Sequence, residues 1–176
     1  MPGINVHGVK AHYADVGRGA PVVMVHAATN HGGQWDQVRS VMGGHYRYLL
    51  PDLFDSGRTA PWPGIRALTF YGEADILLGV LDAVGEAVHL AGHSYGGAVA
   101  LRAVVRGGSR ILSLCLIEPG GCPLLAAADQ GDQTGAWRNF FNYYRGNPNS
   151  WDSLDVETQA KIMAKPIPSG RSIAPR

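Results

Sequence analysis

The sequence has almost no excess charge and few cysteines, and each shortage excludes a class of protein. Its 15 lysines and arginines nearly balance 14 aspartates and glutamates, which leaves a formal net charge of +1. A chain without a strongly basic surface has no electrostatic case for binding nucleic acid or an anionic membrane. Two cysteines are too few for a disulfide framework, and Cys115 lies in an apolar run that predicts a buried, reduced thiol.

Long apolar segments and cofactor signatures are also missing. No stretch is long and apolar enough to span a bilayer, and the residues at 1–7 form neither the basic region nor the apolar region of a secretory signal. We therefore expect a cytoplasmic protein. Because the sequence contains no phosphate-binding glycine fingerprint and no clustered metal ligands, we expect no cofactor and no metal.

The residues that are present alternate between strand-like and helix-like patterns. Apolar strand candidates occupy 4–6, 11–14, 21–26, 46–50, 87–91 and 111–117. Helical spacing occurs near 34–42, 66–84 and 97–105. The segment 52–64 is rich in glycine and proline and predicts a loop, whereas Gly85 is placed to end the second helix. Such alternation predicts an α/β fold, a mostly parallel sheet with helices on both faces.

One serine stands where a predicted strand meets a predicted helix. Ser94 is the middle residue of the string G-H-S-Y-G at 92–96, which follows one apolar run and precedes the helical pattern. The string alone is weak evidence, but this setting is that of a nucleophile elbow. There the serine adopts a strained, positive φ that raises its hydroxyl above the sheet, and glycines on either side prevent collisions. Ser94 is therefore the candidate nucleophile.

Further landmarks resemble the α/β-hydrolase family. His26 resembles the His-Gly end of the family's third strand, and Trp35 follows it at a similar spacing. An Asp-x-x-x-x-Gly-Arg loop runs over 52–58, and Leu-Ile-Glu-Pro at 116–119 resembles another strand end. Together with the elbow, these landmarks cover about residues 4–120. The resemblance implies a serine hydrolase of the esterase type, which acts on a small ester or related acyl substrate.

The resemblance also implies an oxyanion hole. In the family, one donor is the N–H of the residue after the nucleophile, here Tyr95, and the other lies in the loop after the third strand, here Ala28. Two such donors stabilise the charge that forms when the serine attacks a carbonyl. Two residues depart from the family pattern. Ala27 replaces the usual glycine, and Asp55 stands where another glycine is usual, although aspartate tolerates a positive φ.

The general base of the family is missing from its usual place. The family orders its triad as serine, acid and histidine, yet no histidine follows Ser94. The seven histidines are His7, His12, His26, His31, His45, His89 and His93. His93 occupies an elbow position whose side chain usually packs away from the reacting face. His26 and His31 are candidate substrate contacts, and the alternative for His26 is a structural histidine that steadies the oxyanion loop.

An acid candidate follows the last predicted strand. Glu118 resembles the triad acid of some branches of the family, and it lies at the sheet edge where catalytic side chains gather. The alternative is a carboxylate that caps the next turn.

The strand–helix alternation ends at Pro119. We expect residues 1–120 to form the hydrolase core, 121–164 to begin a helical cap with two helices over 134–164, and 165–176 to be a disordered tail. Members of the family run to roughly 250 residues, so we expect a C-terminally truncated hydrolase. Its incomplete sheet would leave an apolar edge, which predicts self-association.

Two functions remain open. The first is a serine hydrolase that is impaired because no histidine follows Ser94. The second is a catalytically inactive protein that binds a ligand or a partner on the same scaffold, since a fold does not imply catalysis. Dehalogenases and epoxide hydrolases are disfavoured because those relatives carry aspartate at the position of Ser94.

Overall fold

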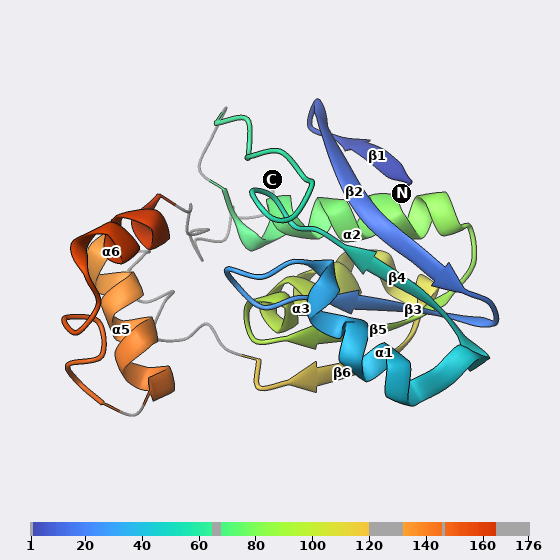
Figure 1. Ribbon diagram of the computed structural model, residues 1–176. Helices are drawn as coiled ribbons and strands as arrows, with labels where there is room; N and C mark the ends of the chain where they lie inside the picture. Colours follow the sequence, from blue (N-terminus) through green and yellow to red (C-terminus); the bar gives the residue numbers. More distant parts are fainter. Residues whose placement is uncertain (1, 65–67, 120–131, 146, 165–176) are drawn as a thin grey trace. The chain divides into compact units, whose positions relative to one another are not determined.

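The computed structural model describes residues 2–64, 68–119, 132–145 and 147–164 (Figure 1). The chain divides into two compact units. The first comprises Met1–Gly64 and Tyr71–Gly120, and the second comprises Ile65–Phe70 and Gly121–Arg176. Among the described residues, no helix has both the length and the apolar character needed to cross a membrane.

The first unit is built on a six-stranded, mostly parallel sheet. Its strands are β1 (Gly3–Val6), β2 (Val9–Gly17), β3 (Ala20–Val25), β4 (Tyr46–Pro51), β5 (Val88–His93) and β6 (Ile111–Ile117). They lie side by side in the order β1-β2-β4-β3-β5-β6, with β1 and β2 antiparallel to their neighbours and the other four mutually parallel. Because β4 and β5 flank β3 on opposite sides, the strand order reverses there. Ligands usually bind outside the carboxyl ends of the strands at such a point.

Helices cover both faces of this sheet, as the alternation predicts (Figure 1). The connecting elements are η1 (Gly32–Trp35), α1 (Asp36–Met42), η2 (Gly43–His45), α2 (Phe70–Val84), α3 (Tyr95–Gly107) and η3 (Gly108–Arg110). On one face, Trp35 packs in a buried cluster with Val22 and Met24 of β3. On the other face α2 and α3 lie together, and Arg106 of α3 donates to Asp75 of α2 at 2.5 Å. The α/β fold class is confirmed.

Two local predictions are also confirmed, and one boundary is shifted. Residues 52–64 contain neither helix nor strand, and Gly85 ends α2 with a φ of 71° and an N–H that donates to Leu81. The helical pattern that begins at residue 66 corresponds to α2, which starts at Phe70. Amphipathic spacing therefore locates this helix but not its first turn.

The strand β6 is less buried than its apolar composition predicts. Leu112 is 60% exposed, Ile117 is 41% exposed, and Cys115 is exposed as well. The prediction of a buried thiol at Cys115 is therefore wrong. The physical reason is position: within the part of the chain that the structure describes, β6 pairs with β5 alone and forms the edge of the sheet. An apolar run does not distinguish an edge strand from a central one.

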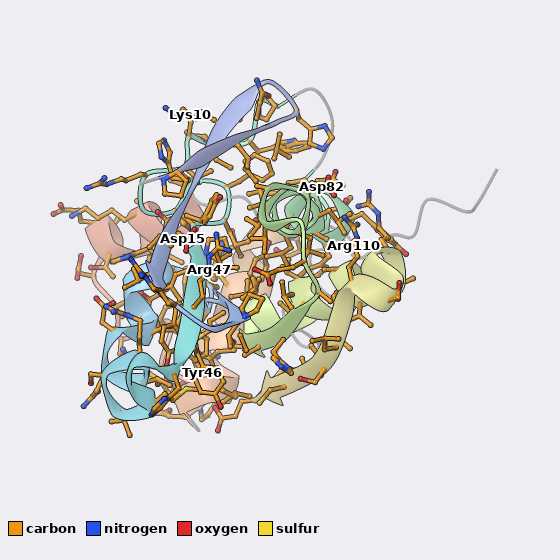
Figure 2. All side chains as sticks on the ribbon, turned by 90° about the vertical axis from the view of Figure 1, so that its right-hand side faces the viewer. Lys10, Asp15, Tyr46, Arg47, Asp82 and Arg110 are labelled. Atoms are coloured by element: carbon orange, nitrogen blue, oxygen red, sulfur yellow. The ribbon has the colours of Figure 1, made fainter. Side chains whose placement is uncertain are left out.

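Ion pairs join neighbouring elements on the surface of this unit. Arg47 of β4 and Asp15 of β2 point toward one another, and the guanidinium donates to both carboxylate oxygens at 2.9 and 2.7 Å (Figure 2). This bidentate hydrogen bond lowers the pKa of Asp15. Arg110, immediately before β6, pairs with Asp82 of α2 (Figure 2).

The described residues of the second unit form two helices, as their sequence pattern predicts. They are α5 (Gln133–Arg145) and α6 (Val156–Met163). Trp151 holds the turn between them. Its ring packs edge-on against that of Phe141, with 5.6 Å between the ring centroids, and its backbone N–H donates to the side-chain oxygen of Asn142 at 3.0 Å. The assignment of 121–164 to a cap stays a prediction, and the predicted disorder of 165–176 lies outside the described residues.

We expect the exposed edge to make the chain self-associate at micromolar concentrations, because an unpaired apolar edge strand accepts another strand. Leu112→Lys should shift the sedimentation coefficient toward that of a monomer, since lysine on an edge strand opposes pairing. Val156→Lys is the control, because Val156 is 81% exposed but lies on α6. A wild-type chain that sediments as a monomer at these concentrations contradicts the prediction.

Candidate active site

The turn at the end of β5 has the strained backbone geometry expected of a nucleophile elbow. Ser94 lies between β5 and α3 with φ 52° and ψ −119°, and it is only 5% exposed. Its N–H donates to the carbonyl of Ile117 at 2.9 Å, and its own carbonyl accepts the N–H of Gly97 at 2.9 Å. Hydrogen bonds on both sides therefore hold the residue in a conformation that an L-amino acid otherwise avoids.

The two elbow glycines are required by close backbone contacts. A Cβ at Gly92 would lie 2.5 Å from the carbonyl oxygen of Gly96. A Cβ at Gly96 would lie 2.5 Å from the carbonyl oxygen of Val25 and would also strike that of His26. The start of α3 therefore lies directly against the end of β3, which brings the elbow next to the loop that follows β3. The expected reason for these glycines is confirmed.

The loop after β3 is fixed at Ala27. The carbonyl of Ala27 accepts the Nδ1 hydrogen of His26 at 2.7 Å and the N–H of Asn30 at 3.3 Å, and its N–H donates to the side-chain oxygen of Gln34 at 2.9 Å. Ala27 does not have a positive φ, so alanine replaces the family's glycine without backbone strain. No hydrogen bond joins the N–H of Ala28 to any residue that the structure describes. The role of Ala28 as an oxyanion donor stays a prediction.

His26 has the hydrogen bonds of a structural histidine. Its side chain is buried, and its Nε2 accepts the N–H of Leu53 at 3.0 Å. A backbone N–H can only donate, so the ring proton lies on Nδ1, where it donates to the carbonyl of Ala27. Both ring nitrogens therefore connect the end of β3 to backbone groups of adjacent loops. This geometry favours the structural interpretation over a substrate contact.

A buried carboxylate organises the loop after β4. Asp52 accepts the N–H of Gly32 at 2.8 Å on one oxygen and the N–H of Arg58 at 3.0 Å on the other. Asp55 has a φ of 54°, so aspartate does maintain the turn in place of glycine, as expected. From the sequence, this loop was recognisable only as a motif that resembles the family. In the structure, Asp52 holds it against η1, the element that follows the loop after β3.

A second buried carboxyl group contacts Tyr95, the residue after Ser94. Glu73 of α2 is 2% exposed, and it accepts the hydroxyl of Tyr95 at 3.1 Å and the N–H of Phe54 at 3.2 Å. Burial, together with a smaller effect of the nearby Asp55 charge, outweighs the lowering effect of both hydrogen bonds and raises the pKa of Glu73 to about 8. Burial and the adjacent Glu73 also raise the pKa of Tyr95. Sequence reasoning missed this pair, although a glutamate on the apolar face of a helical pattern was a visible signal.

The remaining sequence candidates occupy the periphery of the site. His31 is exposed and caps η1 by accepting the N–H of Gly33 at 3.1 Å, and it lines a cavity of about 410 Å³ together with Asp36 and Arg58. Glu118 is exposed, has a φ of 44°, and directly follows Ile117, whose carbonyl binds the Ser94 N–H. The roles of His31 and Glu118 stay predictions.

We expect Gly96→Ala to reduce the free energy of unfolding by about 1–3 kcal/mol, because its Cβ would meet backbone oxygens that cannot move aside independently. Gly44→Ala is the matched control, since nothing lies within 4 Å of a Cβ at Gly44. The control should change stability by no more than about 0.5 kcal/mol. Urea unfolding of both variants measures the difference, and equal effects would contradict the close approach at Gly96.

The raised pKa of Glu73 predicts a pH dependence of stability. The folded state binds this proton more tightly than the unfolded state, whose glutamate has the ordinary pKa of 4.5. The stabilisation is complete below about pH 4.5 and is lost as the pH rises to about 8. Glu73→Gln should flatten the urea-unfolding free energy across this window, whereas Glu157→Gln, at an exposed site, should leave the wild-type slope. Equal slopes in wild type and Glu73→Gln would refute the assignment.

Comparisons with known proteins agree with this geometry. Residues 22–171 match the Alpha/beta hydrolase family. The chain is 33% identical over 125 residues to the non-heme chloroperoxidase CPO-A1 of Kitasatospora aureofaciens. This match covers 70% of the chain and 45% of the chloroperoxidase. It is 36% identical over 117 residues to the 2-hydroxy-6-oxo-2,4-heptadienoate hydrolase of Pseudomonas putida. This match covers 62% of the chain and 41% of the hydrolase.

A solved structure gives the same result. The thermophilic esterase of Thermogutta terrifontis is similar with a TM-score of 0.59 and 27% identity, over 65% of this chain and 44% of the esterase. The chain therefore spans less than half the length of these three proteins. Because the family match runs over most of its residues, the chain belongs to the α/β-hydrolase family, whose members here include esterases and other hydrolases.

Proposed function

We propose that this protein is an acyl hydrolase that uses Ser94 as its nucleophile on a small ester or related acyl substrate. The observation that carries the proposal is the strained elbow, with Ser94 at φ 52° and its Gly96 packed directly against the end of β3. The esterase and the dienoate hydrolase among the similar proteins support the same reaction class.

The proposed reaction begins when the Ser94 Oγ attacks the carbonyl carbon of the substrate and loses its proton to a base. The carbonyl oxygen becomes an oxyanion, which the N–H groups of Ala28 and Tyr95 stabilise. Collapse of this intermediate breaks the bond to the leaving oxygen, which takes the proton from the base and departs as the alcohol. The acyl group stays on Ser94, and water then hydrolyses it. Each oxyanion donor typically contributes about 3 kcal/mol to lowering the barrier.

The proposed reaction needs a general base that accepts the proton of Ser94. No histidine follows Ser94, and His93 already accepts a hydrogen bond from Gln34 on its Nδ1. Glu118 is the candidate acid, because it follows the strand whose last carbonyl binds the Ser94 N–H. Without a histidine between them the triad is incomplete, so we expect these 176 residues by themselves to turn over substrate slowly.

Both ring nitrogens of His26 and the Nδ1 of His93 are hydrogen-bonded to groups other than Ser94, which favours a second candidate function. A hydrolase scaffold without a base would act as a ligand-binding or interaction protein. Such a protein would bind an acyl analogue but would not form a covalent bond with it. The two functions therefore differ in whether Ser94 reacts.

A fluorophosphonate probe tests this difference directly. We expect slow labelling of the wild-type chain, located at Ser94 by mass spectrometry, and no labelling of Ser94→Ala. Ser113→Ala is the matched control, because Ser113 is an exposed serine on β6 that bonds to His89. It should label at the wild-type rate. If the wild-type chain binds a non-hydrolysable acyl analogue but is never labelled, the second function replaces the first.

A further inference from the structure

One side chain joins the two segments that carry the proposed oxyanion donors. Gln34 lies in η1, and its side-chain oxygen accepts the N–H of Ala27 at 2.9 Å. Its side-chain nitrogen lies 3.0 Å from Nδ1 of His93. Ala27 immediately precedes Ala28, and His93 immediately precedes Ser94. A single amide therefore connects the loop after β3 to the elbow after β5.

The direction of each hydrogen bond follows from the backbone. The N–H of Ala27 can only donate, so the oxygen of the Gln34 amide must face it. The amide nitrogen then faces His93 and can only donate, so Nδ1 of His93 is an acceptor and the neutral ring carries its proton on Nε2. No other common side chain of this length supplies an acceptor and a donor in this order. Glutamate would present a second acceptor to Nδ1, and methionine would supply neither bond.

The far side of the bridge is packed as well. Trp35, the residue after Gln34, is buried and contacts the His93 ring edge-on at 6.4 Å between centroids. His93 is therefore held by Trp35 and Gln34, which leaves the ring few alternative orientations. The elbow backbone is fixed through His93 to the same element, η1, that fixes Ala27.

We propose that Gln34 is a positioning residue of the oxyanion hole, because its amide sets the distance between the loop that carries Ala28 and the elbow that carries Tyr95. This role rests on the proposed function of Ser94, since the two N–H groups matter to catalysis only if an oxyanion forms there. Gln34 itself does not touch the reacting atoms. It acts through Ala27 on one side and through His93 on the other.

The first experiment measures the rate at which the full chain reacts with a fluorophosphonate. Gln34→Met retains the length of the side chain but removes both hydrogen bonds, and it should slow labelling of Ser94 by about 10–100-fold, because small misplacements cost this much. Gln37→Met, at an exposed position on α1, is the matched control and should react like wild type. A Gln34→Met protein that is folded by circular dichroism and labels at the wild-type rate overturns the proposal.

The second experiment separates positioning from stability by removing one of the two hydrogen bonds. In Gln34→Glu, the carboxylate still accepts the N–H of Ala27 but no longer supplies an amide donor to Nδ1 of His93. Its labelling rate should therefore lie between those of wild type and Gln34→Met. A merely structural role would change the melting temperature without this order of rates. Equal labelling rates for the two variants contradict the role of the bridge.

A third measurement distinguishes failure of the proposal from failure of the proposed function. If wild type is never labelled, the function at Ser94 fails, and nuclear magnetic resonance then tests the bridge alone. We expect wild-type His93 to carry its proton on Nε2, and Gln34→Met to shift the amide signals of both Ala28 and Tyr95. If both amide signals stay in place, Gln34 does not set the position of the donors.

Discussion

The structure of the site depends on one close approach, that of the first turn of α3 to the end of β3. Gly96 has no side chain, so its backbone lies directly against the carbonyl groups of Val25 and His26. Because of this contact, the chain must turn sharply between β5 and α3, and Ser94 at the turn has a φ of 52°. It also brings the loop after β3 close enough for one glutamine to reach both segments.

Backbone N–H groups then determine the protonation of the side chains around this contact. The N–H of Leu53 assigns the ring proton of His26 to Nδ1, and the N–H of Ala27, acting through Gln34, assigns that of His93 to Nε2. The two histidines near Ser94 thus hold opposite tautomers for reasons that lie in the main chain. Each ring has a hydrogen-bonded role before any substrate arrives, which is why neither resembles a free general base.

The sequence predicted features that depend on local pattern, and it missed features that depend on tertiary position. Strand and helix periods located the sheet, and the elbow and Asp55 were recognisable because positive φ values favour particular residue types. Cys115 was placed wrongly because an apolar run does not reveal which strand ends the sheet. Gln34 was missed because its importance arises from Ala27 and His93, and His93 is 59 residues away along the chain.

The hydrogen bond from the Ser94 N–H to Ile117 has a consequence for dynamics. Ile117 ends β6, the edge strand, and edge strands open more readily than central ones because fewer bonds hold them. The backbone of Ser94 is therefore tied to an edge strand of its sheet. Each opening of the end of β6 would release the Ser94 amide to solvent, so its hydrogen-exchange rate would report how often the elbow loses its strained shape.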